Sequence, residues 1–160
     1  MKDSFAVKKA NGETLEIALR PARDDEKDFC RQVHHLAYHD VVERQFGRWD
    51  EGQQDALFHE VLHMPHLQII EVNGQRAGGF RYEAHEDHFL LAEIQLLPAF
   101  QGQAIGTGLI RQLQNTANTY KLPLRLRVLK GNRARILYQR LGFKATGEDP
   151  THYLMEWTGN

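Results

Sequence analysis

The segment LLPAFQGQAIGTGLIRQL, residues 96–113, places a strand end, a proline, a glycine-rich loop and a helix start in immediate succession. Pro98 ends the strand because it has no N–H to donate to a neighbouring strand. The loop Gln101–Gly108 opens an amphipathic helix that we expect to run to about Tyr120. Successive backbone N–H groups in such a loop, with the positive end of the helix dipole, can hold a phosphate. The segment therefore predicts a phosphate-binding turn, with a simple chain reversal as the alternative use of its glycines.

Two common phosphate-binding motifs do not fit this loop. No Gly-Lys-Ser/Thr follows, so it is not a Walker loop. The next strand does not end in an acidic residue, which argues against a dinucleotide-binding fingerprint.

Alternation and turn signals around the loop predict one mixed domain over residues 1–160. The Asn73-Gly74 pair is a strong hairpin signal, Asp50 can cap a helix, and Gly142 can end one. We expect strands at 14–20, 67–72, 75–82, 89–97, 122–129, 143–146 and 151–157. We expect helices at 24–39, 50–63 and 132–141, besides the helix that the loop 101–108 opens. This order predicts an α/β (α+β) fold with helices around one central sheet.

The composition narrows the function classes. The 160 residues carry a formal net charge of -1, with both signs interspersed, which does not favour a nucleic-acid binder. No apolar stretch approaches the length of a membrane span, and the N-terminal residues lack the apolar region of a secretory signal. Together with the single cysteine, Cys30, these features lead us to expect a cytoplasmic protein.

Two segments resemble motifs of the GNAT superfamily of N-acetyltransferases. Pro98–Ile110 (PAFQGQAIGTGLI) resembles motif A, whose signature is Gln/Arg-x-x-Gly-x-Gly/Ala, and Asn132–Phe143 (NRARILYQRLGF) resembles motif B. The resemblance is strong from about Leu90 to Trp157 and weaker before that. It implies a mostly antiparallel sheet of about 6–7 strands, flanked by about four helices and splayed between the fourth and fifth strands. It also implies acetyl-CoA as co-substrate, with no metal.

By resemblance, the gap between strands 89–97 and 122–129 receives the pantetheine arm, which pairs with backbone groups of Leu96 and Leu97. Asn132 would contact the same arm, and Tyr138 would lie near the thioester sulfur. The pyrophosphate would lie on Gln101, Gly102, Gln103, Ala104, Ile105, Gly106, Thr107 and Gly108. Ala104 stands where the family usually has its first glycine, so we expect slightly weaker or reshaped pyrophosphate binding.

The implied reaction moves the acetyl group to a primary amine by direct attack in a ternary complex. Tyr138 is the predicted general acid for the leaving thiolate, and packing in the core is its alternative role. Glu93 is a candidate base because a carboxylate beside a cleft can have its pKa raised; otherwise it is an ordinary solvated carboxylate. A water chain or His152 could replace it.

The acceptor should bind near the two N-terminal helices and the loop that joins them, with His152 close by. The candidate contacts on these helices and this loop are Tyr38, His39, Phe46, Trp49 and Gln53. Trp49 beside Asp50 and Glu51 could form a wall for a cationic amine or could anchor the loop. The acceptor, a small-molecule or peptide amine, is not readable from these residues. The last two predicted strands resemble segments that often lie at dimer contacts in the family, and this resemblance is compatible with a homodimer.

Two other functions are compatible with parts of the sequence. His59-Glu60-Val61-Leu62-His63 is a literal H-E-x-x-H, the zinc-binding pattern of metalloproteases. Pro65 ends that helix before a third ligand could follow, and nine histidines make a chance match easy, so this reading is remote. A GNAT-fold module that binds acyl-CoA without catalysis is the nearer alternative.

Overall fold

A computed structural model describes residues 1–159 of the chain. Eight strands form one sheet in the order β1-β2-β3-β4-β5-β6-β8-β7. They are β1 (Ser4–Lys8), β2 (Thr14–Pro21), β3 (Gln68–Val72), β4 (Gln75–Ala84), β5 (Phe89–Leu96), β6 (Leu124–Leu129), β7 (Lys144–Glu148) and β8 (His152–Trp157). All neighbours are antiparallel except β5 and β6. The predicted fold class, a mixed and mostly antiparallel sheet with four α-helices, is confirmed.

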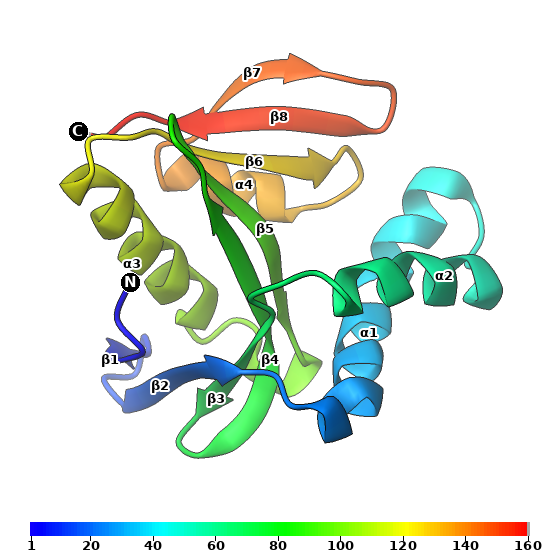
Figure 1. Cartoon of the computed structure of the whole chain (residues 1–160), viewed down its shortest axis with the longest axis horizontal. Helices are drawn as coiled ribbons and strands as arrows, with labels where there is room; N and C mark the ends of the chain where they lie inside the picture. The colour runs from blue at the N-terminus through cyan, green and yellow to red at the C-terminus, as the bar shows by residue number, and fades with distance from the viewer. Residues whose placement is uncertain (160) are drawn as a thin grey trace.

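The helices cover both faces of this sheet (Figure 1). They are α1 (Lys27–Phe46), α2 (Glu51–Leu62), α3 (Ile105–Thr119) and α4 (Ala134–Arg140), with short 3-10 turns η1 (Asp24–Glu26) and η2 (Pro98–Phe100). Consecutive strand residues point to opposite faces. Accordingly, Ile69 packs with Cys30 and Phe58 under α1 and α2, whereas Ile70 belongs to the larger core under α3 and α4.

The count of strands exceeds the predicted 6–7 because β1 was not anticipated. Its five residues form an edge strand paired with β2 through a turn that contains Asn11 and Gly12. Only Phe5 and Val7 turn toward the core, and both remain partly exposed. The alternation of apolar and polar residues that indicates a strand is therefore weak here. The Asn11-Gly12 pair is the same hairpin signal as Asn73-Gly74, and it could have revealed this strand.

The residues at two helix ends explain where α2 begins and where α1 stops. Asp50 caps α2 as expected, since its Oδ1 accepts a hydrogen bond from the Gln53 N–H at 2.9 Å. By contrast, α1 continues seven residues past the predicted end at His39 and stops at Gly47, whose φ of 83° only glycine adopts easily.

The parallel pair β5 and β6 joins the two halves of the sheet over a short distance. The register contains Phe89↔Leu124, Leu90↔Arg125 and Leu91↔Leu126, and the strands part after that point. A β-bulge at Ala92, where Tyr82 pairs with Leu91 and Arg81 with Glu93, accompanies the parting. The predicted splay between the strands at 89–97 and 122–129 is therefore present.

Within residues 1–159, no helix has the length and apolar character needed to cross a membrane.

Candidate active site

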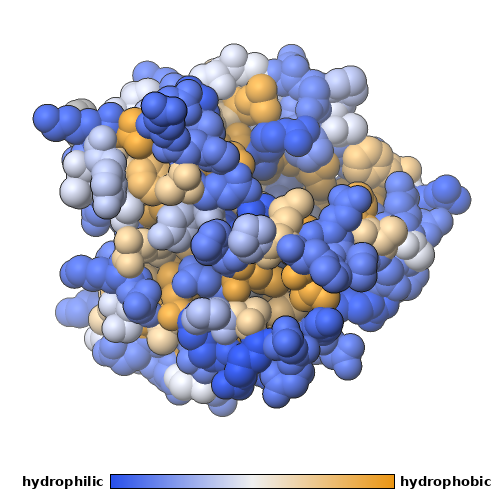
Figure 2. All heavy atoms as spheres, in the orientation of Figure 1, coloured by the Kyte–Doolittle hydropathy of each residue, from blue (hydrophilic) through white to orange (hydrophobic). Residues whose placement is uncertain are grey.

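A cleft of about 1150 Å³ lies where β5 and β6 part. Its walls come from α1 and α2 on one side, β5 and β6 at the base, and the loop before α3 with α4 on the other. Figure 2 shows a hollow in the surface, with apolar side chains along it. The pair of helices α1 and α2 lies on one side of this hollow, and the half of the molecule that carries β6 and β8 lies on the other. Strand β5, the loop before α3 and α4, which come from separate parts of the sequence, thus border one continuous space.

The glycine-rich loop forms a tight turn at one end of this cleft. Gly102 and Ala104 both have left-handed backbones, with φ of 73° and 67°. Two side-chain amides hold the turn: Gln101 Nε2 donates to Leu96 O at 3.0 Å, and Gln103 Nε2 donates to Ala99 O at 2.8 Å. The first N–H groups of α3 have no acceptor within the helix. Gln101 to Thr107 line the cleft, so these donors can serve an anion there.

Two of the predicted cofactor residues face elsewhere. A Cβ added to Gly108 would collide with the Val7 side chain on β1, so this glycine permits close packing of α3 on the sheet. The Leu97 N–H donates to Ala77 O, which commits it to β4. Neither residue lines the cleft, whereas Leu96 does.

Four polar side chains meet at the base of the cleft. Gln95 donates through Nε2 to the carboxylate of Glu93 and to the hydroxyl of Tyr38, the latter at 3.3 Å. The bulge at Ala92 precedes Glu93, so Glu93 and Gln95 still share a face. Burial raises the pKa of the Glu93 carboxyl, opposed by the Gln95 hydrogen bond and the Arg81 charge.

Tyr138, from α4, completes this group. Burial, with a smaller contribution from the Glu93 charge, raises its pKa to about 12. The same two causes raise the pKa of Tyr38. Tyr138 packs edge to face against Phe143 at 5.8 Å and also lines the cleft. Both predicted roles of Tyr138, core packing and access to the reacting group, are therefore available to it.

Asn132 and His152 lie at the α4 side of the cleft. Asn132 Oδ1 accepts from the Ala134 N–H at 2.9 Å, which caps the first turn of α4. His152 contacts Thr151 Oγ1 at 2.7 Å, and burial together with the Arg127 charge lowers its pKa. Both side chains are thus held by neighbouring groups while they face the cleft.

The structure does not bring Trp49 or His39 to the cleft. The Trp49 ring packs against His35 and His39, and its Nε1 donates to Glu51 at 2.6 Å. This contact pattern matches the anchoring role.

The end of the cleft formed by α1 and α2 is lined by three of the candidate acceptor contacts, Tyr38, Phe46 and Gln53. It is also lined by residues that we did not single out: His34, Val42, Arg48, Gln54 and Leu57. The spacing of His34, Tyr38 and Val42, four residues apart on one helix face, could have indicated most of the α1 wall.

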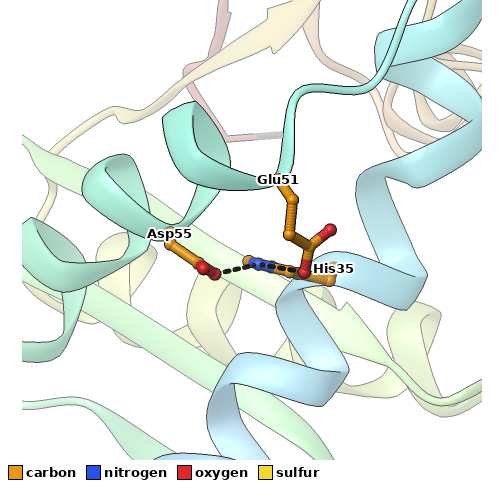
Figure 3. Close-up of side chains that lie close together, drawn as sticks. All are labelled: His35, Glu51 and Asp55. Carbon is orange, nitrogen blue, oxygen red and sulfur yellow. Dashed lines mark hydrogen bonds and ion pairs between the residues drawn. The ribbon is translucent and has the colours of Figure 1, made fainter.

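The H-E-x-x-H histidines gain no third metal ligand among the described residues. The rings of His59 and His63 lie tilted to each other with their centres 4.3 Å apart, and His63 Nδ1 is bound to the His59 carbonyl. Two groups of three possible ligands occur among residues 1–159, and neither includes them. They are His39 with Asp40 and Glu43, and His35 with Glu51 and Asp55 (Figure 3).

A sheet that opens between two parallel strands, above a turn rich in free N–H groups, is suited to a transferase that takes its acyl group from coenzyme A. Residues 64–145, slightly more than half of the chain, match the family model described as acetyltransferase (GNAT) domain. The chain therefore belongs to the GNAT acetyltransferases, and the resemblance of the two motifs is confirmed. A search of curated proteins gives no match.

Solved structures share this fold. The PaiA N-acetyltransferase of Thermoplasma acidophilum in complex with coenzyme A superposes with a TM-score of 0.69 at 16% identity, over 89% of this chain and 98% of that one. The ribosomal-protein-S18-alanine N-acetyltransferase of Escherichia coli has a TM-score of 0.63 at 16% identity, over 90% of this chain and 95% of that one. An acetyltransferase of Thermus thermophilus has a TM-score of 0.68 at 15% identity, over 88% of this chain and 96% of that one. At such low identity the likeness concerns the fold.

Proposed function

We propose that this protein transfers an acetyl group from acetyl-CoA to a primary amine, with both substrates bound in the cleft between β5 and β6. The observation that carries the proposal is the convergence of three elements on one space. The parted strands offer unpaired backbone for the pantetheine arm, the loop before α3 offers N–H donors for the pyrophosphate, and Tyr138 lines the same cleft.

We assign Tyr138 as general acid and Glu93 as base. As the amine nitrogen bonds to the thioester carbon, it loses a proton to the Glu93 carboxylate. The carbon–sulfur bond then breaks, and the departing thiolate takes the proton of the Tyr138 hydroxyl. Glu93 returns its proton to Tyr138, directly or through water. Burial supports both assignments, since it raises the pKa of Glu93 and keeps Tyr138 protonated at neutral pH.

A thiol-release assay tests the activity. The purified protein is incubated with acetyl-CoA and, in turn, with spermidine, L-lysine, kanamycin and a peptide that begins with alanine. We expect release of free CoA and a matching N-acetyl product, identified by mass spectrometry, with at least one amine. Coenzyme A binding without transfer to any amine would contradict the proposal and favour a non-catalytic binding module.

A further inference from the structure

Two adjacent histidines of α1 are buried although nothing in the proposed mechanism uses them. His34 and His35 are only 8% and 9% exposed. His34 lines the cleft, with its ring 5.0 Å from that of Tyr38 on one side and 5.0 Å from Phe58 on the other. Histidines are seldom buried to this degree without a defined hydrogen-bond arrangement.

A continuous chain of hydrogen bonds connects His34 to a surface carboxylate. His34 Nδ1 lies 3.1 Å from His35 Nδ1, and His35 Nε2 lies 2.7 Å from Asp55 Oδ1. Asp55 is ionised, because hydrogen bonds from Arg31 and then His35 lower its pKa. The chain therefore runs from the cleft, through both rings, to a carboxylate on the exposed side of α2.

These contacts determine where the ring protons lie when both histidines are neutral. A carboxylate can only accept, so His35 must carry its proton on Nε2 and has a lone pair on Nδ1. His34 must then donate from Nδ1, which leaves the lone pair of its Nε2 free. Burial, with a smaller effect of His35, lowers the pKa of His34 to about 4. His34 is therefore neutral at pH 7, with an unprotonated Nε2 on a ring that lines the cleft.

The same contacts argue against reading His35, Glu51 and Asp55 as a metal site (Figure 3). The Arg31 guanidinium donates to both carboxylates, at 2.7 Å to Asp55 and 2.5 Å to Glu51. Trp49 donates to the second Glu51 oxygen. The positive charge and the donors that these oxygens need are already supplied by the protein, so the group is better suited to orienting His35.

The reaction itself calls for a second proton acceptor. An ammonium group has three N–H bonds and the amide product has one, so two protons leave the nitrogen. In the proposed mechanism one of them reaches the thiol through Glu93 and Tyr138. The other must be removed earlier, because only a neutral amine can attack the thioester.

We propose that Nε2 of His34 accepts this first proton from the acceptor's ammonium group, with His35 and Asp55 as positioning residues. One N–H bond of the ammonium breaks and the Nε2–H bond of His34 forms. The resulting imidazolium keeps donating from Nδ1 to His35, whose Nε2–H donates to the Asp55 carboxylate. The hydrogen bonds through His35 to Asp55 orient the His34 ring, much as the aspartate orients the histidine of a catalytic triad. The proton passes to water when the product leaves. This assignment rests on the proposed acetyl transfer.

Nitrogen NMR of the protein labelled with 15N-histidine tests the ring protons without any substrate. At pH 7 we expect His34 to be protonated on Nδ1 and not on Nε2, assigned with the His34→Gln and His35→Gln variants. A proton on Nε2 of His34 would overturn the proposal.

Kinetics test the role of His34, using the best amine of the panel above. For His34→Gln we expect kcat/KM to fall about 100-fold at pH 7. The deficit should shrink as pH rises toward the pKa of the amine, because the solution then supplies neutral amine. His39→Gln, on the same helix but outside the cleft lining, is the matched control and should match the wild type. A loss that is equal at every pH would indicate a structural role and contradict the proposal.

Asp55→Asn provides a second variant in case His34→Gln does not fold. It should show the same pH-dependent deficit at a smaller size, and Asp55→Glu should restore part of the rate. A wild type that acetylates no amine would overturn the proposed function itself. An active wild type with unchanged pH profiles in both variants would overturn only the role of His34.

Discussion

Ala104 stands where the motif that this loop resembles usually has glycine, and its backbone is in a conformation that favours glycine. Its φ of 67° is left-handed, which costs a non-glycine residue about 1–2 kcal/mol. We predict that Ala104→Gly binds CoA about threefold to tenfold more tightly, since it removes a methyl group from the phosphate turn and lets the backbone come closer to the ligand. The free energy of unfolding should change by less than about 1 kcal/mol, because glycine also gains freedom in the unfolded chain. Calorimetric titration and urea unfolding measure both quantities.

The control for this prediction is Ala104→Val. A β-branched side chain at a positive φ should both destabilise the protein and weaken CoA binding. Equal affinities of the glycine, alanine and valine proteins would show that the loop does not contact the pyrophosphate.

Tyr138 is the residue whose substitution we expect to lower the rate of acetyl transfer most. Tyr138→Phe removes only the hydroxyl and leaves the packing against Phe143. We predict a fall in kcat of about 100-fold to 10,000-fold with little change in CoA affinity or melting temperature. An acid must be protonated to act, and its pKa of about 12 keeps it so across the usual range, so the wild type should show no alkaline loss from this group below about pH 11. Retention of full activity by the phenylalanine protein would assign Tyr138 to the core alone.

Glu93 should influence rate and stability in opposite directions. Burial raises its folded pKa above the unfolded value, so its ionised form is disfavoured in the folded state and stability falls as pH rises through that interval. Glu93→Gln should therefore increase thermal stability at pH 7, while it lowers kcat about 10-fold to 1,000-fold. In the wild type, kcat should fall as pH decreases through the raised pKa. A lower melting temperature of the glutamine protein would contradict this account.

At the scale of elements, the packing of α3 on β1 rests on Gly108. A Cβ at this position would overlap the Val7 side chain, and overpacking of this kind costs about 1–3 kcal/mol. We predict that Gly108→Ala lowers the free energy of unfolding by about 1–2 kcal/mol, since alanine regains part of the loss through its helix propensity. The double variant with Val7→Ala should recover most of the stability. A stable single variant would mean that β1 is not held against α3.

Local sequence signals predicted most of the helices and strands, but they did not predict β1 or the contacts between helices. Strong alternation, the Asn73-Gly74 turn and the cap at Asp50 predicted most elements correctly, because each signal is local. The strand β1 was missed because only two of its residues face the core. The loop and α4 carried recognisable motifs, whereas the acceptor wall on α1 and α2 did not. The contacts between His34, His35 and Asp55 depend on how two helices pack, and local patterns contain no information about that.

At the scale of the whole molecule, the cleft exists because the two halves of the sheet touch only briefly. Three register pairs join β5 to β6, and Gln45 of α1 adds a bridge to the far half by donating to Thr151 O and accepting from the Gly131 N–H, each at 2.8 Å. The opening between these two contacts is the space in which a thioester and an amine could meet. We propose that acetyl-CoA occupies this opening.

Calorimetric titration of the purified protein with acetyl-CoA, CoA and NADH tests that claim most directly. We predict micromolar binding of acetyl-CoA and CoA at one site per chain and no binding of NADH, because the loop and the parted strands suit the pantetheine and pyrophosphate of CoA. Failure of both CoA ligands to bind, or equal binding of NADH, would contradict the assignment of the cleft.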